Sequence, residues 1–233
     1  MHEKGRFKYI LFDFDGTVTE SAPGITRSVQ NALRSVGIDE PDLKKLERFV
    51  GPPLSYSFHA FYGLSEDEVR HCIDVFHERY DSVGLFENAL YPGVAKMLEE
   101  LSGRGCYLAV ASSKPQRFID RLTEHFGIAE YFSLKVGAAA ELMPSRDPKR
   151  TDKDEIIAGV MERIMQDRDV HDPESFRNMT AMVGDRMFDM EGAIHNGITP
   201  VGVSYGYGSR EELITAGAVF VADSAGQLTE FFS

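Results

Sequence analysis

Two aspartates near the start of the chain, Asp13 and Asp15, have residue types and a spacing suited to carboxylate chemistry. They follow residues 7–12, an apolar run rich in β-formers that predicts a strand buried on both faces. Side chains alternate along a strand, so residues i and i+2 can serve one site. Charge at the end of a buried strand is costly unless something compensates it. Because open parallel sheets bind ligands at this edge, the pair predicts a functional site, whereas an Asp-Gly turn would account for only one aspartate.

Other polar side chains stand where further elements end or begin. Ser112 and Asp185 each follow an apolar run that predicts a buried strand, and Asp189 comes four residues after Asp185. Lys153 directly precedes a helical pattern. Each has a simpler alternative: Ser112 could cap the next helix, Lys153 could be a solvated lysine, and Asp189 could offset a helix dipole.

The segment Asp13-Phe14-Asp15-Gly16-Thr17 resembles the first motif of the haloacid-dehalogenase superfamily, whose members mostly hydrolyse phosphate monoesters. The order of acid pair, serine, lysine and Gly-Asp-x3-Asp is similar to the four motifs of that family, over essentially the whole chain. Arg150-Thr151-Asp152-Lys153 resembles the third motif of phosphoglycolate-phosphatase-like relatives. It departs from the Lys-Pro-x-Pro form of other branches, and Lys149 lies nearby as a competing candidate.

The resemblance assigns catalytic roles that meet the needs of phosphoryl transfer: a nucleophile, a proton donor and neutralisation of charge. It implies that Asp13 is the nucleophile, which forms an aspartyl-phosphate. Asp15 would protonate the leaving alkoxide and then, as a base, activate water. Ser112 resembles the hydroxyl that hydrogen-bonds the phosphoryl group, and the ammonium of Lys153 would pair with Asp13 or Asp189.

A metal ion is also expected, because three or four converging carboxylates would resist ionising together. Mg²⁺ takes hard oxygen ligands and keeps positions for water and phosphate. The resemblance implies that Asp13 and Asp185 ligate it through their side chains and Asp15 through its backbone carbonyl. Asp189 is similar to the outer or water-mediated partner, with its dipole role the open alternative.

The elements that must position these residues fall into two kinds. Residues 20–89 carry four successive helical patterns without a strand, which does not fit a β-α alternation. We therefore expect a small helical cap domain at 20–89, inserted into an α/β core formed by 1–19 and 90–233. The alternation that follows predicts a Rossmann-like, doubly wound parallel sheet for the core.

Two short connections join the expected cap to the core, at residues 17–21 and 84–92. Their glycine and proline content predicts that the cap closes as a lid and excludes water from the site. The polar stretch 142–152 predicts a loop.

Substrate choice would depend on cap residues that face the site. The stretch that contains Arg48, Gly51 and Pro52 resembles the cap of phosphoglycolate phosphatases and of bacterial 5′-nucleotidase-like relatives. Gly51 and Pro52 would let a rigid turn approach the ligand, and Arg48 could supply a cation for a carboxylate. A plain interhelical turn with a solvated arginine is the alternative.

Further candidate substrate contacts are Gly16, Thr17 and Ser113, which adjoin the first two motifs; for Ser113, and for Lys114 beside it, a structural role is the favoured interpretation. We expect hydrolysis of a small phosphate monoester, with phosphoglycolate first and a nucleoside monophosphate second. A phosphosugar mutase and a catalytically silent binding protein on the same fold are the alternatives.

Composition bounds the partners and the compartment. The 233 residues carry a formal net charge of −12, which disfavours binding of nucleic acid through a basic face. Cys72 and Cys106 have no metal-ligand or redox spacing and predict free thiols in a reducing compartment. With no signal-peptide core and no membrane span, we expect a cytoplasmic monomer or homodimer.

Overall fold

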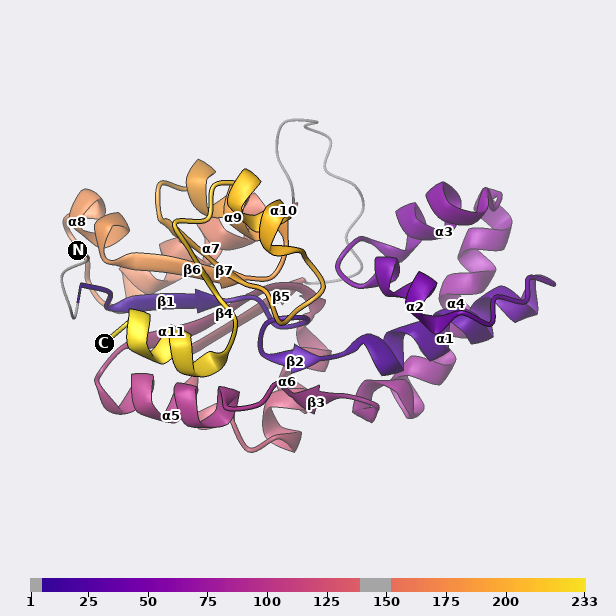
Figure 1. The fold of residues 1–233 in the computed structure, drawn as a ribbon, viewed down its shortest axis with the longest axis horizontal. Helices are drawn as coiled ribbons and strands as arrows, with labels where there is room; N and C mark the ends of the chain where they lie inside the picture. Colours follow the sequence, from indigo (N-terminus) through magenta and orange to yellow (C-terminus); the bar gives the residue numbers. More distant parts are fainter. Residues whose placement is uncertain (1–5, 139–151) are drawn as a thin grey trace.

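A six-stranded parallel sheet forms the centre of the computed structural model, which describes residues 6–138 and 152–233 (Figure 1). Its strand order is β5-β4-β1-β6-β7-β8. The strands span, in chain order, β1 (Tyr9–Phe12), β4 (Tyr107–Pro115), β5 (Leu134–Ala138), β6 (Thr180–Gly184), β7 (Thr199–Val203) and β8 (Phe220–Ala222). The sheet confirms the predicted Rossmann-like α/β fold.

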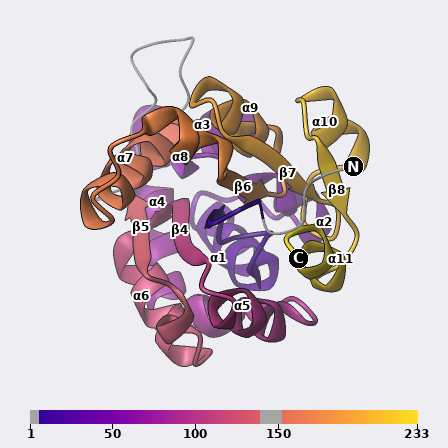
Figure 2. The same ribbon diagram turned by 90° about the vertical axis from the view of Figure 1, so that its left-hand side faces the viewer.

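Both faces of this sheet are covered by helices, so β1 is buried on both sides (Figure 2). Ile10 and Phe12 belong to one apolar cluster, and Leu11 between them belongs to another, as strand alternation requires. The core helices are α5 (Val94–Gly103), α6 (Gln116–His125), α7 (Asp152–Asp167), α8 (Pro173–Asn178), α9 (Met187–His195), α10 (Arg210–Thr215) and α11 (Ala225–Phe231), with a 3-10 turn η3 (Ala129–Tyr131).

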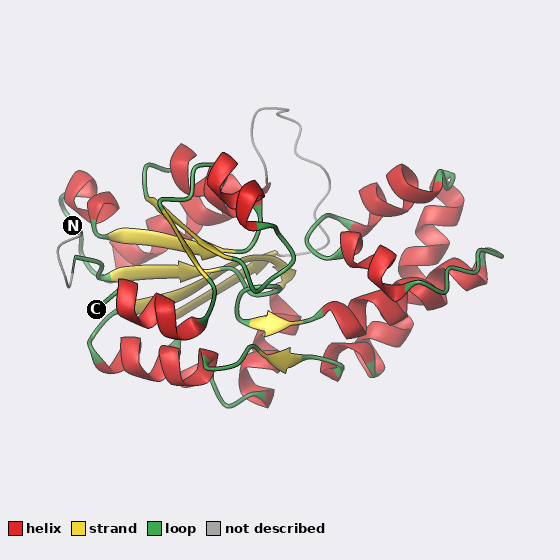
Figure 3. Cartoon of the chain, viewed as in Figure 1, coloured by secondary structure: helices red, strands yellow, loops and turns green. Residues whose placement is uncertain are grey.

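The segment between β1 and β4 contains a helical unit that lies to one side of the core (Figure 3). We call this unit, residues 22–86, the cap. It comprises α1 (Ala22–Ser35), α2 (Leu43–Leu46), η1 (Glu47–Phe49), α3 (Leu54–Tyr62), α4 (Glu66–Ser82) and η2 (Gly84–Phe86). The helix α4 begins with a capping box formed by Ser65 and Glu68.

Two short strands, β2 (Thr19–Glu20) and β3 (Ala89–Leu90), pair antiparallel where the chain leaves and re-enters the core. The sequence did not predict them, because two residues are too few to give a periodic pattern. The expected boundaries at 19/20 and 89/90 fall inside this pair. The two connections are therefore hydrogen-bonded to each other at the base of the cap.

Other departures from the expected elements are local. The apolar run that starts at residue 131 forms strand only from Leu134 onwards, because a 3-10 turn occupies residues 129–131. The helix α8 was not expected; Asp172 caps it by accepting hydrogen bonds from two backbone N–H groups. The loop expected at 142–152 lies outside the described residues, apart from Asp152, where α7 begins. Within the described ranges no helix is long and apolar enough to cross a bilayer.

Candidate active site

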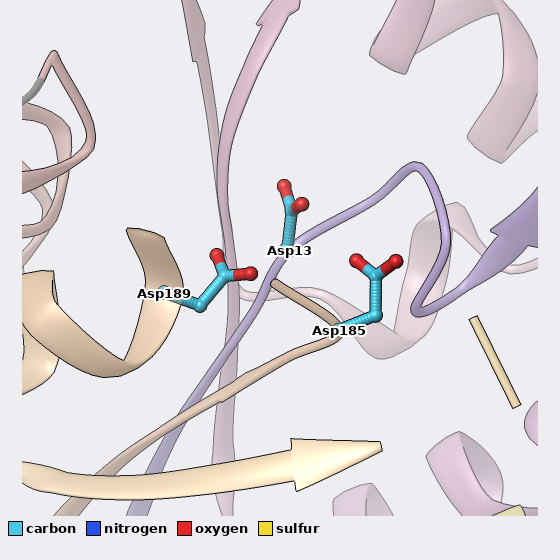
Figure 4. Close-up of side chains that lie close together, drawn as sticks. All are labelled: Asp13, Asp185 and Asp189. Carbon is cyan, nitrogen blue, oxygen red and sulfur yellow. The ribbon is translucent and has the colours of Figure 1, made fainter. Parts of the chain in front are cut away.

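Three carboxylates meet at the carboxyl edge of the central strands. Asp13 follows β1 and Asp185 follows β6, and these strands are parallel neighbours, so both side chains reach the same edge. The N–H of Asp13 donates to the carbonyl of Val183, 2.9 Å away. Asp189 lies in the first turn of α9. Each of the three carboxylates offers an oxygen within 4.8 Å of the others, and Figure 4 shows their side chains converging.

Burial makes this cluster electrostatically demanding. The side chains of Asp185 and Asp189 are almost fully buried. Burial, followed by the nearby charges of Asp189 and Asp13, raises the pKa of Asp185 well above its ordinary value. Burial also raises the pKa of Asp189. A set of three close, hard oxygen donors, in which burial raises the pKa values of Asp185 and Asp189, fits a divalent cation, whose charge would favour the ionised carboxylates.

Lys153 supplies one positive charge to the cluster. Its Nζ lies 2.8 Å from Oδ1 of Asp13 and 2.8 Å from Oδ1 of Asp189. It also donates to the carbonyl of Ala111, 3.0 Å away. Burial alone would lower the pKa of the ammonium, but the two carboxylates outweigh burial and raise it. The sequence expectation that Lys153 pairs with Asp13 or Asp189 understated the arrangement, because the ammonium contacts both.

A second buried lysine, Lys114, contacts Asp15. Its Nζ lies 3.0 and 2.9 Å from the two carboxylate oxygens, and it donates to the hydroxyl of Tyr80 on α4, 2.7 Å away. The sequence analysis favoured a structural role for Lys114, and the structure instead brings it to a candidate catalytic carboxylate. Its spacing of two from Ser112 could have indicated this, because alternate residues of an extended chain share a side. Nothing in the sequence pattern of α4 pointed to Tyr80.

The first turn after β1 packs tightly against Asp185. Gly16 has a φ of +86°, and a Cβ at this position would lie 2.2 Å from an oxygen of Asp185. The hydroxyl of Thr17 donates to the same carboxylate over 3.5 Å. Ser112, which is 2% exposed, accepts a hydrogen bond from the N–H of Lys114 at 3.3 Å. These residues therefore line the same sheet edge, while the half-buried Ser113 has no side-chain hydrogen bond within the described ranges.

The loop after β7 completes the surroundings of Asp185, and the sequence analysis missed it. The N–H of Tyr207 donates to the carboxylate of Asp185 over 2.8 Å. A Cβ on Gly206 would lie 2.4 Å from Cβ of Asp185, and one on Gly208 would lie 2.0 Å from its backbone oxygen. The two closely spaced glycines between β7 and α10 were a signal for this approach of backbone to a functional side chain.

The predicted substrate contacts in the cap have different surroundings. The guanidinium of Arg48 stacks over Phe61, 4.2 Å from the ring centroid, and among the described residues no ion pair joins it to the carboxylates. Gly51 has a φ of +105°, and a Cβ there would lie 4.0 Å from Nη1 of Arg186. Pro52 follows in the same turn and is half-buried. The turn therefore faces the core, but the cation opposite it is Arg186 rather than Arg48.

Arg186 is held in place by Glu212. One carboxylate oxygen of Glu212 accepts from Nε of Arg186 at 3.0 Å and from the N–H of Met187 at 2.9 Å. The guanidinium is consequently anchored through its Nε, while its Nη1 faces the turn at Gly51.

Comparison with known proteins gives a family and several named relatives. The family model for haloacid dehalogenase-like hydrolases matches residues 10–203. A 5′-nucleotidase of Pseudomonas aeruginosa is 43% identical over 209 residues, 89% of this chain and 87% of that protein. The tyrosine-protein kinase PtkA of Mycobacterium tuberculosis is 32% identical over 95% of this chain and 70% of its own length. A phosphoglycolate phosphatase of Vibrio parahaemolyticus is 29% identical over 96% of this chain and 95% of its own.

A solved structure agrees over the full length. The crystal structure of a putative phosphatase from Clostridium difficile matches with a TM-score of 0.82 and 33% identity, and covers 100% of both chains. The similarity therefore includes the cap as well as the sheet.

Proposed function

Because this chain belongs to the haloacid dehalogenase-like hydrolase family and is a phosphatase of that family, we propose that it is a Mg²⁺-dependent hydrolase of a small phosphate monoester. The observation that carries the proposal is the position of Asp13. Its carboxylate follows the central strand, lies against Lys153, and shares a 4.8 Å cluster with Asp185 and Asp189. The proposed nucleophile, a fixed cation and a donor set that suits a metal ion therefore lie close together, which supports the proposal.

In the proposed reaction, the carboxylate of Asp13 attacks phosphorus, and the bond from phosphorus to the leaving oxygen breaks. Asp15 gives its proton to that oxygen, so the alcohol leaves neutral. Asp15 then takes a proton from water, which attacks the aspartyl-phosphate, releases inorganic phosphate and restores Asp13. The hydroxyl of Ser112 would hold a phosphoryl oxygen throughout, and Gly16 and Thr17 would line the same turn.

Charge neutralisation has two sources in this proposal. Lys153 offers a fixed ammonium against Asp13. The side chains of Asp13, Asp185 and Asp189, with the backbone carbonyl of Asp15, would hold Mg²⁺. When bound, the ion would neutralise charge on the phosphoryl oxygens and lower the pKa values that burial raises.

For the leaving group, the relatives support nucleoside monophosphates before phosphoglycolate. The relative named 5′-nucleotidase is 43% identical to this chain, and the relative named phosphoglycolate phosphatase is 29% identical. This order reverses the sequence expectation, which favoured phosphoglycolate. Arg186, beside the turn at Gly51, offers a cation to either leaving group.

The test is hydrolysis of 4-nitrophenyl phosphate by the purified protein with Mg²⁺, with and without a chelator. We expect turnover that the chelator abolishes and Mg²⁺ restores. Undetectable turnover would favour a binding protein on this fold. A panel of nucleoside monophosphates and phosphoglycolate, compared by kcat/KM, then ranks the substrates, and isomerisation of a sugar phosphate without release of phosphate would indicate a mutase.

A further inference from the structure

The structure joins a tyrosine of the cap to the proposed acid of the core through one buried lysine. Tyr80, near the end of α4, accepts a hydrogen bond from Nζ of Lys114 at 2.7 Å. The same ammonium lies 3.0 and 2.9 Å from the two oxygens of Asp15. The side chain of Lys114 is 3% exposed and that of Asp15 is 15% exposed, so water competes little for these contacts.

We propose that Lys114 and Tyr80 are positioning residues that place the Asp15 carboxyl group for proton transfer to the leaving oxygen. The inference rests on the proposed function and extends it, because it gives the cap a part in the chemistry besides any part in substrate choice. Proton transfer depends steeply on the position of the acid, and the contact of one ammonium with both oxygens of Asp15 restricts rotation of the carboxyl group.

The hydroxyl and the ring of Tyr80 have different contacts, so a substitution can remove one and keep the other. The ring packs against Phe76 and Phe118, with centroids 5.1 and 5.2 Å away. Phe76 belongs to the cap and Phe118 to α6 of the core, so the ring contributes to the packing of cap on core. The Tyr80→Phe variant keeps this packing and removes only the hydrogen bond to Lys114.

Lys114 has no second carboxylate to hold it among the described residues. Within this part of the chain its side chain contacts the carboxylate of Asp15 and the hydroxyl of Tyr80, and its Nζ lies 5.3 Å from the centroid of the Tyr80 ring. Without the hydroxyl, the ammonium would keep one charged partner and gain rotational freedom. Asp15 would then lose a fixed position rather than its charge partner, which predicts a loss in the proton-transfer step and not in binding.

The experiment compares two aryl esters of similar shape, phenyl phosphate and 4-nitrophenyl phosphate, by their kcat/KM values. Phenolate is far more basic than 4-nitrophenolate, so its departure depends more on the acid. We expect Tyr80→Phe to reduce kcat/KM about tenfold for phenyl phosphate, the equivalent of one hydrogen bond, and about twofold or less for 4-nitrophenyl phosphate. Lys114→Gln should change the ratio of the two values in the same direction and further, by about a hundredfold.

The matched control is Tyr107→Phe, which also removes the hydroxyl of a buried tyrosine. The hydroxyl of Tyr107 donates to the carboxylate of Asp167 at 3.1 Å. This pair lies away from the site, so the ratio should stay at the wild-type value. Equal losses of kcat/KM on both esters in Tyr80→Phe would overturn the inference, since Lys114 would then have a structural role. A rise in KM alone would also overturn it, since Lys114 would then contact the substrate. If the wild-type protein hydrolyses neither ester, the proposed function fails, and the inference fails with it.

Discussion

Lys153 and Lys114 are both almost fully buried, and each contacts one of the two aspartates that follow β1, yet they belong to different parts of the molecule. Every contact of Lys153 described above lies within the core: Asp13 after β1, Asp189 on α9 and a carbonyl of β4. Lys114 contacts Asp15 in the core and Tyr80 in the cap. Burial would lower the pKa of each lysine, but the partners outweigh it and raise the pKa: Asp13 and Asp189 for Lys153, and Asp15 with Tyr80 for Lys114.

The difference lies in what fixes each ammonium. Lys153 lies between two carboxylates of the core, one directly after β1 and one on α9, so the core alone defines its position. Lys114 has one carboxylate, and its second polar partner comes from a separate helical unit. Asp13, the proposed nucleophile, is thus supported by the core, while Asp15, the proposed acid, depends on how the cap packs on the core.

The largest expected effect comes from replacing Asp13, the proposed nucleophile, which Lys153 contacts. Asp13→Asn keeps the shape of the side chain but cannot form the aspartyl-phosphate, so kcat should fall at least about ten-thousandfold. Steady-state turnover of 4-nitrophenyl phosphate measures this, with Asp39→Asn on the exposed surface of the cap as the control. Full activity in Asp13→Asn would show that another residue is the nucleophile.

Replacing each lysine by methionine should distinguish the cluster around Lys153 from the cluster around Lys114 by how Mg²⁺ changes the free energy of unfolding. Without Mg²⁺, Lys153→Met leaves Asp13 and Asp189 buried without their cation and should lower the free energy of unfolding by about 3–5 kcal/mol. Added Mg²⁺ should restore part of this loss, because the freed carboxylates are proposed metal ligands. Lys114→Met should also be destabilised, but Mg²⁺ should restore little of its loss.

Urea unfolding of both variants and the wild type, with Mg²⁺ and with a chelator, measures the effect. Equal rescue of the two variants by Mg²⁺ would remove the distinction between the clusters.

Contacts within the core could be predicted from the sequence, whereas the contact between core and cap could not. The sheet, the cap helices and the approach of Asp13, Asp185 and Asp189 to one another were predictable, because strand ends and motif order are local patterns. The contact between Lys114 and Tyr80 was not, since it depends on how α4 packs against the core. A tyrosine in an apolar helical stripe has the same pattern whether or not its hydroxyl reaches a catalytic group.

The cap turn illustrates the same limit. The sequence indicated that Gly51 approaches the site, and the backbone there has the positive φ that favours glycine. It could not indicate which arginine lies opposite, because Arg48 and Arg186 are far apart in the sequence. Stacking on Phe61 accounts for Arg48, and only the fold brings Arg186 to the turn.

A smaller effect is expected from pH, acting through Asp185. The pKa of Asp185 is raised in the folded protein. Below the pKa of the unfolded chain, Asp185 is protonated in both the folded and the unfolded state, so its burial costs no ionisation energy. Stability is then lost as the pH rises through the folded pKa. The metal-free protein should therefore lose stability as the pH rises above the ordinary aspartate pKa of about 4. Mg²⁺ displaces the proton, so the difference in Tm between Mg²⁺ and chelator should grow with pH. Asp185→Asn should abolish this growth, and a difference in Tm that stays constant with pH would contradict the assignment.

The smallest effect concerns Arg186, a cation at the rim whose side chain is 24% exposed, against 6% and 3% for the two lysines. Its guanidinium is anchored by Glu212 and faces the turn at Gly51, so it is placed to contact a leaving group rather than the phosphoryl group. Arg186→Ala should raise KM for a nucleoside monophosphate about fivefold, the equivalent of about 1 kcal/mol, and leave kcat within about twofold. Arg34→Ala, which removes an exposed arginine of the cap, is the control. A fall in kcat with KM unchanged would instead place Arg186 with the two lysines, among the groups that support the reacting carboxylates.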